Sequence, residues 1–173
     1  LAFKKKKTYN NIENLVMLHI FRDSSFITLD KKRIFFDYID WINQTIKILK
    51  DTKETWFFKI HPNAYQWGED SNYIINKLIK DHNTKNIKVI SDGNINKMKN
   101  LKKIVTYSGS VSYEAVSIGL KPIIISSNAL YKYNNDFVHK PKDLGVYKQL
   151  ILSNNYKIFK VKKSSAQQAK KMI

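Results

Sequence analysis

The sequence predicts an α/β fold: a Rossmann-like, doubly wound parallel sheet of about five strands with helices on both faces. Short apolar runs alternate with amphipathic stretches along the chain, and this order is typical of parallel strands joined by helices. With 173 residues, 43% of them apolar, the chain suits one domain with a hydrophobic core. It has no apolar run near the roughly 20 residues of a membrane-spanning helix, so we expect a soluble protein.

The first half of the chain contains three expected strands. Residues 15–21 form an apolar run interrupted only by His19, which predicts a buried strand. Asp30 can cap a following helix, because apolar positions recur at helical spacing from Phe35 to Leu49. The next expected elements are a strand at 55–60, a helix at 74–79 and a strand at 87–90.

The second half repeats this alternation. Residues 104–107 predict a strand that leads into Ser108-Gly109-Ser110. A short helix over 111–118 then ends at Gly119, because glycine adopts a left-handed C-terminal cap without Cβ strain. The other expected elements are a short helical segment at 95–101, a strand at 123–125 after Pro122 and a helix at 143–152.

The charge of +17 is concentrated at the ends of the chain. Residues 8–154, with 21 basic and 14 acidic residues, carry only +7. The basic residues are nearly all lysine, whereas nucleic-acid readers favour arginine for bidentate contacts. We therefore expect no nucleic-acid partner. Composition divides the chain into a basic lead-in at 1–14, the sheet domain at 15–154 and a Lys-rich tail at 155–173, which is a loose extension or a helix that docks elsewhere.

The chain contains no cysteine and four scattered histidines. Disulfides, thiolate nucleophiles, iron–sulfur clusters and Cys-based zinc sites are therefore excluded. The histidines show no metal-binding spacing such as HExxH. We expect neither a metal nor a resident cofactor.

Polar residues follow three of the expected strands. In an open parallel sheet, ligands bind beyond the carboxyl ends of the strands, so these residues are the candidates for a site. The three groups are Arg22-Asp23-Ser24-Ser25, His61-Pro62-Asn63 and Ser108-Gly109-Ser110.

Of these three groups, the Ser-Gly-Ser segment indicates a binding site most specifically. Backbone N–H groups of Gly109, Ser110 and Val111 at a helix start, together with the hydroxyls of Ser108 and Ser110, can hold phosphate oxygens. Gly109 would also let a ligand approach the backbone closely. Ser110 can equally serve as an ordinary helix cap. Both interpretations need the same local geometry, so the sequence leaves both open.

Single residues elsewhere each have two interpretations. His61 can donate to a phosphate, stabilise a leaving group or transfer a proton, or it can be structural. Glu114 can accept hydrogen bonds from ribose hydroxyls or compensate the helix dipole. Asp23 can act as a base or begin a turn. Asp37 and Asp40 are expected on a solvated helix face.

Four segments, taken in order, resemble one known family over about residues 15–150. They look like the C-terminal, donor-binding half of the GT-B glycosyltransferases that build bacterial capsules and related surface polysaccharides. The segments are Leu-His-Ile-Phe-Arg-Asp23-Ser-Ser-Phe, Phe-Lys-Ile-His61-Pro62, Ile-Val-Thr-Tyr-Ser108-Gly109-Ser110-Val-Ser-Tyr-Glu114-Ala and Gly119-Leu-Lys121-Pro122-Ile-Ile.

The resemblance implies one half of a GT-B fold and a nucleotide-activated sugar as donor. In relatives that use CMP-linked acidic sugars, the His-Pro and Ser-rich motifs bind the nucleotide phosphate, and this carries over to His61, Ser108 and Ser110. Glu114 would contact the ribose, and Arg22 and Asp23 would lie at the cleft. The other half, which holds the acceptor and an acidic base in these relatives, is missing, so we expect a piece of a longer enzyme.

The resemblance leaves alternatives open. A teichoic-acid-type polyol-phosphate transferase would use a CDP-polyol, and a UDP-sugar epimerase is disfavoured because its acidic and histidine set is not evident. The implied location is cytoplasmic, with a polysaccharide or lipid-linked acceptor. Lysines at both ends could also attach the enzyme to an anionic membrane, or the chain could be a scaffold without catalytic activity.

Overall fold

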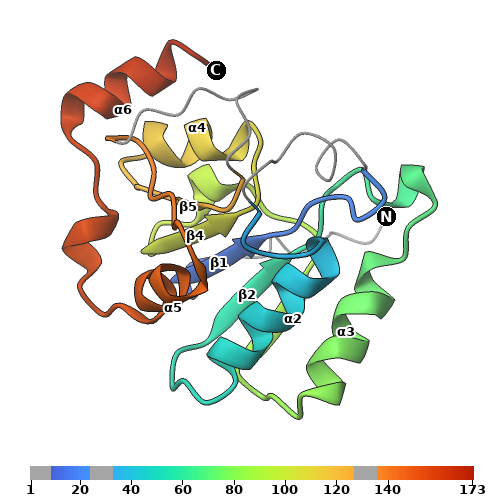
Figure 1. The fold of residues 1–173 in the computed structure, drawn as a ribbon. Coiled ribbons are helices and arrows are strands. Elements are labelled where there is room, and N and C mark those ends of the chain that lie inside the picture. The colour runs from blue at the N-terminus through green and yellow to red at the C-terminus, as the bar shows by residue number, and fades with distance from the viewer. Residues whose placement is uncertain (1–8, 24–32, 127–135) are drawn as a thin grey trace.

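The computed structural model describes residues 9–23, 33–126 and 136–173. Five parallel strands form one sheet in the order β3-β2-β1-β4-β5 (Figure 1). The strands are β1 (Asn14–Met17), β2 (Trp56–Lys59), β3 (Ile87–Ile90), β4 (Lys103–Thr106) and β5 (Ile123–Ile124). The chain runs from β1 outward to β3 and then returns to the other side of β1, so strand order reverses between β1 and β4. The predicted doubly wound parallel sheet is confirmed.

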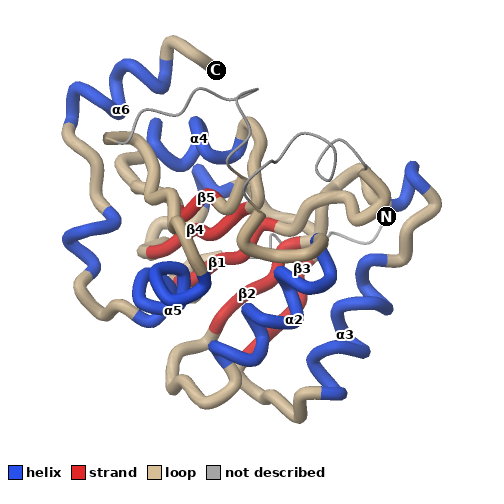
Figure 2. The backbone as a smooth tube through the Cα atoms, in the orientation of Figure 1, coloured by secondary structure: helices blue, strands red, loops and turns tan. Residues whose placement is uncertain are grey.

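Helices cover both faces of this sheet (Figure 2). Apolar side chains of α2, α3 and α5 pack with one face, and those of α4 and η2 with the other. No helix in the described parts of the chain is long and apolar enough to cross a membrane. The helices are α2 (Tyr38–Leu49), α3 (Ser71–Asp81), α4 (Val111–Ser117), α5 (Leu144–Leu152) and α6 (Lys163–Lys170), with the 3-10 turns η1 (Tyr65–Trp67), η2 (Ile95–Lys97) and η3 (Tyr156–Phe159).

Successive strand residues pack on opposite faces of the sheet. Val16, Phe58 and Val105 belong to the core beneath α2, α3 and α5. Their neighbours Leu15 and Ile104 belong to the smaller core beneath α4 and η2. The strands are therefore buried on both sides, which explains why they are apolar throughout.

The first strand is shorter than predicted. Strand β1 ends at Met17, whereas we expected it to continue to residue 21. Leu18 and Ile20 are nevertheless 3% and 6% exposed. The apolar run reflects burial beyond the strand end as well as sheet pairing, and the apolar pattern cannot separate the two.

The predicted start of the following helix was wrong. Helix α2 begins at Tyr38, and its N-cap is Asp37, whose carboxylate accepts a hydrogen bond from the Asp40 amide. The Asp40 carboxylate in turn accepts from the Phe36 amide at 2.9 Å. Asp37 and Asp40 thus form a reciprocal cap and are not simply solvated surface. Asp30, the cap we expected, lies outside the described residues.

The C-terminal tail folds against the domain. Helix α6 packs on α4, where Ala169 and Val116 are both fully buried. Phe159 is fully buried in the larger core, and its carbonyl accepts from the Lys121 amide at 2.8 Å. The tail is therefore not a loose extension, because it forms a helix that docks on the preceding domain.

Candidate functional site

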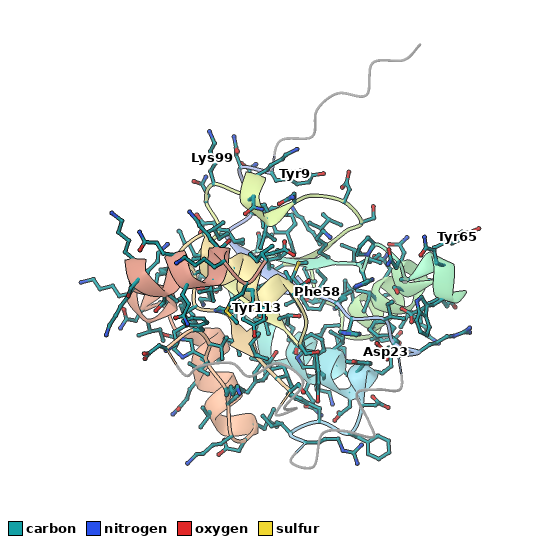
Figure 3. All side chains as sticks on the ribbon, turned by 90° about the horizontal axis from the view of Figure 1, so that it is seen from above. Tyr9, Asp23, Phe58, Tyr65, Lys99 and Tyr113 are labelled. Carbon is teal, nitrogen blue, oxygen red and sulfur yellow. The ribbon has the colours of Figure 1, made fainter. Side chains whose placement is uncertain are left out.

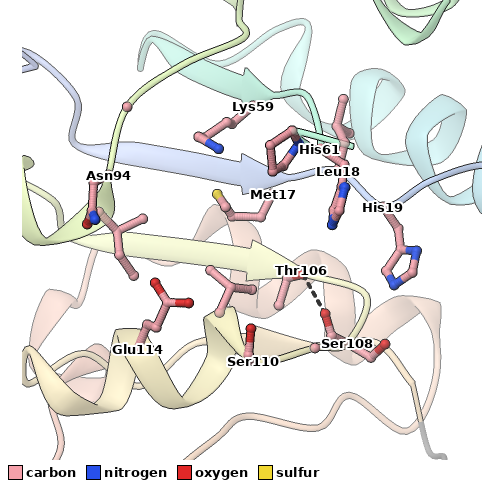
Figure 4. Close-up of a pocket in the computed structure, with 15 residues that line it drawn as sticks. Met17, Leu18, His19, Lys59, His61, Asn94, Thr106, Ser108, Ser110 and Glu114 are labelled. Atoms are coloured by element: carbon pink, nitrogen blue, oxygen red, sulfur yellow. Dashed lines mark hydrogen bonds between the residues drawn. The ribbon is translucent and has the colours of Figure 1, made fainter. Parts of the chain in front are cut away.

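A cavity of about 510 Å³ lies where β1 and β4 end, at the reversal of strand order (Figure 4). Such a switch point is where doubly wound sheets bind ligands. The lining comes from the ends of β1, β2, β3 and β4 and from α4. The lining residues are Met17, Leu18, His19, Lys59, His61, Pro62, Gly93, Asn94, Ile95, Thr106, Ser108, Gly109, Ser110, Val111 and Glu114.

The structure brings together five of the predicted site residues. His61, Ser108, Gly109, Ser110 and Glu114 all line the cavity. In Figure 4, Lys59 and His61 stand on one side of the cavity and the two serines and Glu114 on the other. The segments that carry them are far apart in sequence, so the fold assembles the site.

Arg22 and Asp23 do not line this cavity. Arg22 is exposed, and its Nη1 donates to the Trp67 carbonyl at 3.4 Å. The Asp23 amide donates to the Ile20 carbonyl at 3.1 Å, which closes a turn. The Asp23 carboxylate lies 3.9 Å from Nδ1 of His19, an imidazole that lines the cavity.

Lys59 is a buried cation that faces the cavity. It ends β2, in register with Met17 of β1, which is in register with Thr106 of β4. Lys59 is only 8% exposed. Its Nζ forms no hydrogen bond or ion pair with any described residue. Burial lowers the pKa of Lys59, while the negative charges of Glu114 and Asp92 oppose the shift. An unpaired ammonium in a cavity is ready to bind an anionic or carbonyl oxygen.

His61 presents a hydrogen-bond donor. Its Nδ1 accepts from the Asn63 backbone amide at 3.1 Å, which places the proton of the neutral imidazole on Nε2. Burial, together with the nearby His19 and Lys59, lowers its pKa. His61 is therefore neutral at pH 7, with an N–H group available to a ligand.

His19 is a second imidazole in the cavity wall. Its ring stacks on Tyr38 with centroids 5.0 Å apart, and it lies 6.0 Å from the ring of His61. Burial lowers the pKa of His19, and the charge of Asp23 opposes that shift. The pair therefore adds hydrogen-bonding capacity without adding positive charge near neutral pH.

The Ser-Gly-Ser segment has the backbone that the sequence suggested. Gly109 has a φ of +110°, a conformation that strains any residue with a Cβ. Ser110 is the N-cap residue of α4, but its side chain makes no capping hydrogen bond. The hydroxyl of Ser110 is exposed at the cavity. The interpretation of Ser110 as a side-chain cap is thus not what the structure shows.

Two lining residues were missed as candidates. Lys59 interrupts an apolar strand two positions before His61, and residues two apart share one face of a strand. That spacing was a usable signal. His19 also interrupts an apolar run, but only the end of β1 at Met17 places its ring beside His61. Among the described residues, no group of three or more His, Asp or Glu could hold a metal ion.

The fold has known counterparts. It is similar to UDP-GlcNAc 2-epimerase from Methanocaldococcus jannaschii, in a crystal structure with UDP-GlcNAc and UDP (TM-score 0.50, 17% identity) and in a second structure of that enzyme (TM-score 0.50, 18% identity). The match covers 98% and 94% of this chain but 49% and 45% of the epimerase chains, so this chain spans about half their length. No protein-family model and no curated protein sequence matches the chain. The likeness shows a Rossmann-like fold that corresponds to one half of a GT-B-like protein.

Proposed function

We propose that the cavity binds the nucleotide part of a nucleotide-activated sugar, and that the chain is the donor-binding half of a glycosyltransferase. The observation that carries this proposal is Lys59, a buried and unpaired cation aimed into a cavity at the switch point of the sheet. Burial disfavours the charged form of Lys59, and the charges of Glu114 and Asp92 offset this only in part, since its pKa is lowered. An anionic ligand would offset that penalty.

The opposite wall supplies complementary groups. The hydroxyls of Ser108 and Ser110 and the Nε2–H of His61 can donate to phosphate oxygens. Glu114 can accept from ribose hydroxyls. As the bond from sugar to phosphate breaks, these fixed donors stabilise the negative charge that grows on the leaving phosphate.

The finer assignment rests on the family resemblance of the His-Pro and Ser-Gly-Ser segments. We propose a CMP-linked donor and a role in capsular polysaccharide or lipopolysaccharide synthesis, with a polysaccharide or lipid-linked acceptor. A CDP-polyol transferase is the nearest alternative. Assays with CMP-sugar and CDP-polyol donors separate the two, because each enzyme would consume only its own donor.

The fold neighbours favour a second candidate, a sugar-nucleotide epimerase. Both structural neighbours are structures of UDP-GlcNAc 2-epimerase. An epimerase would return an altered sugar with no acceptor present, whereas a transferase would need the acceptor. Product analysis with UDP-GlcNAc alone therefore distinguishes the two.

The tail lysines can extend the proposal to a membrane surface. Lys157, Lys160, Lys163, Lys170 and Lys171 are all exposed, and each lysine near an anionic surface contributes about 1 kcal/mol. We expect sedimentation with anionic vesicles at low salt. Binding that persists unchanged in high salt would rule out electrostatic attachment.

Thermal unfolding with added nucleotides tests the binding site. A ligand present at 100 times its Kd stabilises by about 2.7 kcal/mol, so one of CMP, CDP, UDP, GDP and ADP should raise the Tm of the wild-type chain. His61→Ala should lose most of that shift while its Tm without ligand changes little. A large drop in Tm with an undiminished nucleotide shift would assign His61 a structural role instead.

A further inference from the structure

We propose that a second cavity, on the other side of His61-Pro62, is a binding subsite for an uncharged saccharide. This inference rests on the proposed function, because it supplies the sugar-binding part of the same site. The cavity has a volume of about 530 Å³. It is lined by Ile60, His61, Pro62, Ala64, Tyr65, Gly68, Glu69, Asp70, Ser71, Asn72 and Ser91.

The two cavities share His61 and Pro62, and all their other lining residues differ. Lys59 and Glu114 line only the first, and the residues of η1 and the start of α3 line only the second. A phosphate held by His61 in the first cavity would therefore have the second cavity as its neighbour. This adjacency is what a transfer of sugar to or from a phosphate requires.

The second cavity differs in charge from the first. Its described lining contains no Lys or Arg, although the chain carries +17. It contains two carboxyl-bearing residues, Glu69 and Asp70. The guanidinium of Arg22 lies beside this wall, where its Nη1 donates to the Trp67 carbonyl, but Arg22 is not among the lining residues. The two carboxylates of the lining itself disfavour phosphate and other anions, so the cavity suits a ligand that is polar but uncharged.

Glu69 is a structural residue in the wall of the second cavity. It is 6% exposed, and one carboxylate oxygen accepts from the amides of Phe21 at 2.6 Å and Arg22 at 3.1 Å. The other oxygen accepts from the Ser71 hydroxyl. Both oxygens are thus used within the protein, and Glu69 holds the loop after β1 against the start of α3.

The rim provides groups that bind hydroxyls. Oδ1 of Asp70 caps α3 by accepting from the Tyr73 amide at 3.0 Å, which leaves its Oδ2 as an acceptor at the cavity. Oδ1 of Asn72 accepts from Asn76 at 2.9 Å, which leaves its side-chain N–H groups as donors. Paired donors and acceptors of this kind match the hydroxyls of a sugar ring.

An aromatic ring completes the subsite. Tyr65 lines the cavity yet is 90% exposed, and Figure 3 shows it at the outer margin of the molecule. Trp67, in the same stretch of chain, is 52% exposed. Flat aromatic surface beside polar groups offers the C–H face of a sugar a place to stack.

Saccharide binding to the whole chain tests this inference by NMR. We would titrate the wild-type chain with lactose, chitobiose and maltotriose, and with sialyllactose as the charged comparison, following the amides of Tyr65, Gly68 and Ser71. At least one neutral probe should shift these amides in a saturable way, and sialyllactose should bind less well. Tyr65→Ala should weaken that binding at least tenfold. Tyr73→Ala is the matched control, because Tyr73 is an exposed tyrosine of the same region that does not line the cavity.

A second arm identifies the source of the sugar. If UDP-GlcNAc shifts these amides while UDP and all free saccharides do not, the subsite holds a neutral donor sugar, and the CMP-linked donor of the proposed function is replaced by a UDP-linked one. If free saccharides shift them, the subsite binds a saccharide that carries no nucleotide. If neither does, or if Tyr73→Ala weakens binding as much as Tyr65→Ala, the inference is wrong. Nucleotide shifts at Ser110 report separately on the proposed function, which can survive that result.

Discussion

Lys59 shows most clearly how a single residue can serve binding at the expense of stability. Lys59 is only 8% exposed, it faces the cavity, and its ammonium group forms no hydrogen bond or ion pair with any described residue. The other buried lysine, Lys103, has a different environment, because its Nζ donates to the Ile151 carbonyl at 3.0 Å and lies near the rings of Trp56 and Phe159. The fold thus supplies partners for the Lys103 ammonium group, whereas under the proposed function a ligand supplies the partner of Lys59.

Replacing Lys59 should therefore stabilise the protein when no ligand is present. Lys59→Met keeps the length of the side chain and removes the buried charge, so we expect an unfolding free energy that is unchanged or raised by roughly 1 kcal/mol. Urea denaturation at pH 7 measures this. Lys88→Met is the matched control, because Lys88 is an exposed strand lysine and should leave stability within about 0.5 kcal/mol. A clear loss of stability in Lys59→Met would show that the charge is compensated within the fold.

At the scale of elements, the tail is part of the folded domain. The rings of Tyr156 and Phe159 in η3 lie 5.3 and 5.6 Å from Nζ of Lys103. His139, beside β5, contacts the Ile158 carbonyl through Nε2 at 2.8 Å. These contacts connect η3 to Lys103 at the start of β4 and to His139 beside β5.

Removal of the tail should therefore destabilise the whole sheet. A chain that ends at Asn154 would expose the apolar surface that Phe159 and Ala169 cover and would remove the rings of Tyr156 and Phe159 from Lys103. We expect a lower Tm, a lower urea midpoint and an unfolding free energy reduced by several kcal/mol, since losing one large core side chain costs about 3–5 kcal/mol. Phe159→Ala should show much of the same loss. A truncated chain that unfolds at the wild-type midpoint would mean that the tail contributes nothing.

At the scale of the whole molecule, stability should depend on pH through buried histidines. Burial lowers the pKa of His19, His61 and His139 below the usual 6.5. Below about pH 6.5, the unfolded chain therefore takes up protons that the folded chain does not, and the unfolding free energy falls. Urea denaturation at pH 7.5, 6.5 and 5.5 should show this loss, and His139→Gln should reduce it. A stability that stays level or rises towards pH 5.5 would contradict this account.

The sequence predicts the sheet and about half of the candidate site. The remaining features depend on burial beyond the strand ends and on strand register, which a sequence pattern does not show. Apolar runs and helical spacing identify the strands, and polar residues after strands identify His61, Ser108 and Ser110. Leu18 and Ile20 are buried although they lie beyond the strand. The apolar run therefore did not reveal that β1 ends at Met17. The role of Lys59 needed the register of three strands, which the spacing of residues within one strand does not supply.

Isothermal titration calorimetry of the intact chain with CMP, CDP and UDP tests the central claim most directly. We expect saturable binding of one nucleotide at a stoichiometry of one, weakened roughly tenfold or more by Lys59→Met, because a hydrogen bond to a charged group contributes about 1.5–3 kcal/mol. Lys88→Met should bind like the wild type. Binding that is equally tight in Lys59→Met, or no binding of any nucleotide, would contradict a nucleotide site in the cavity at the switch point.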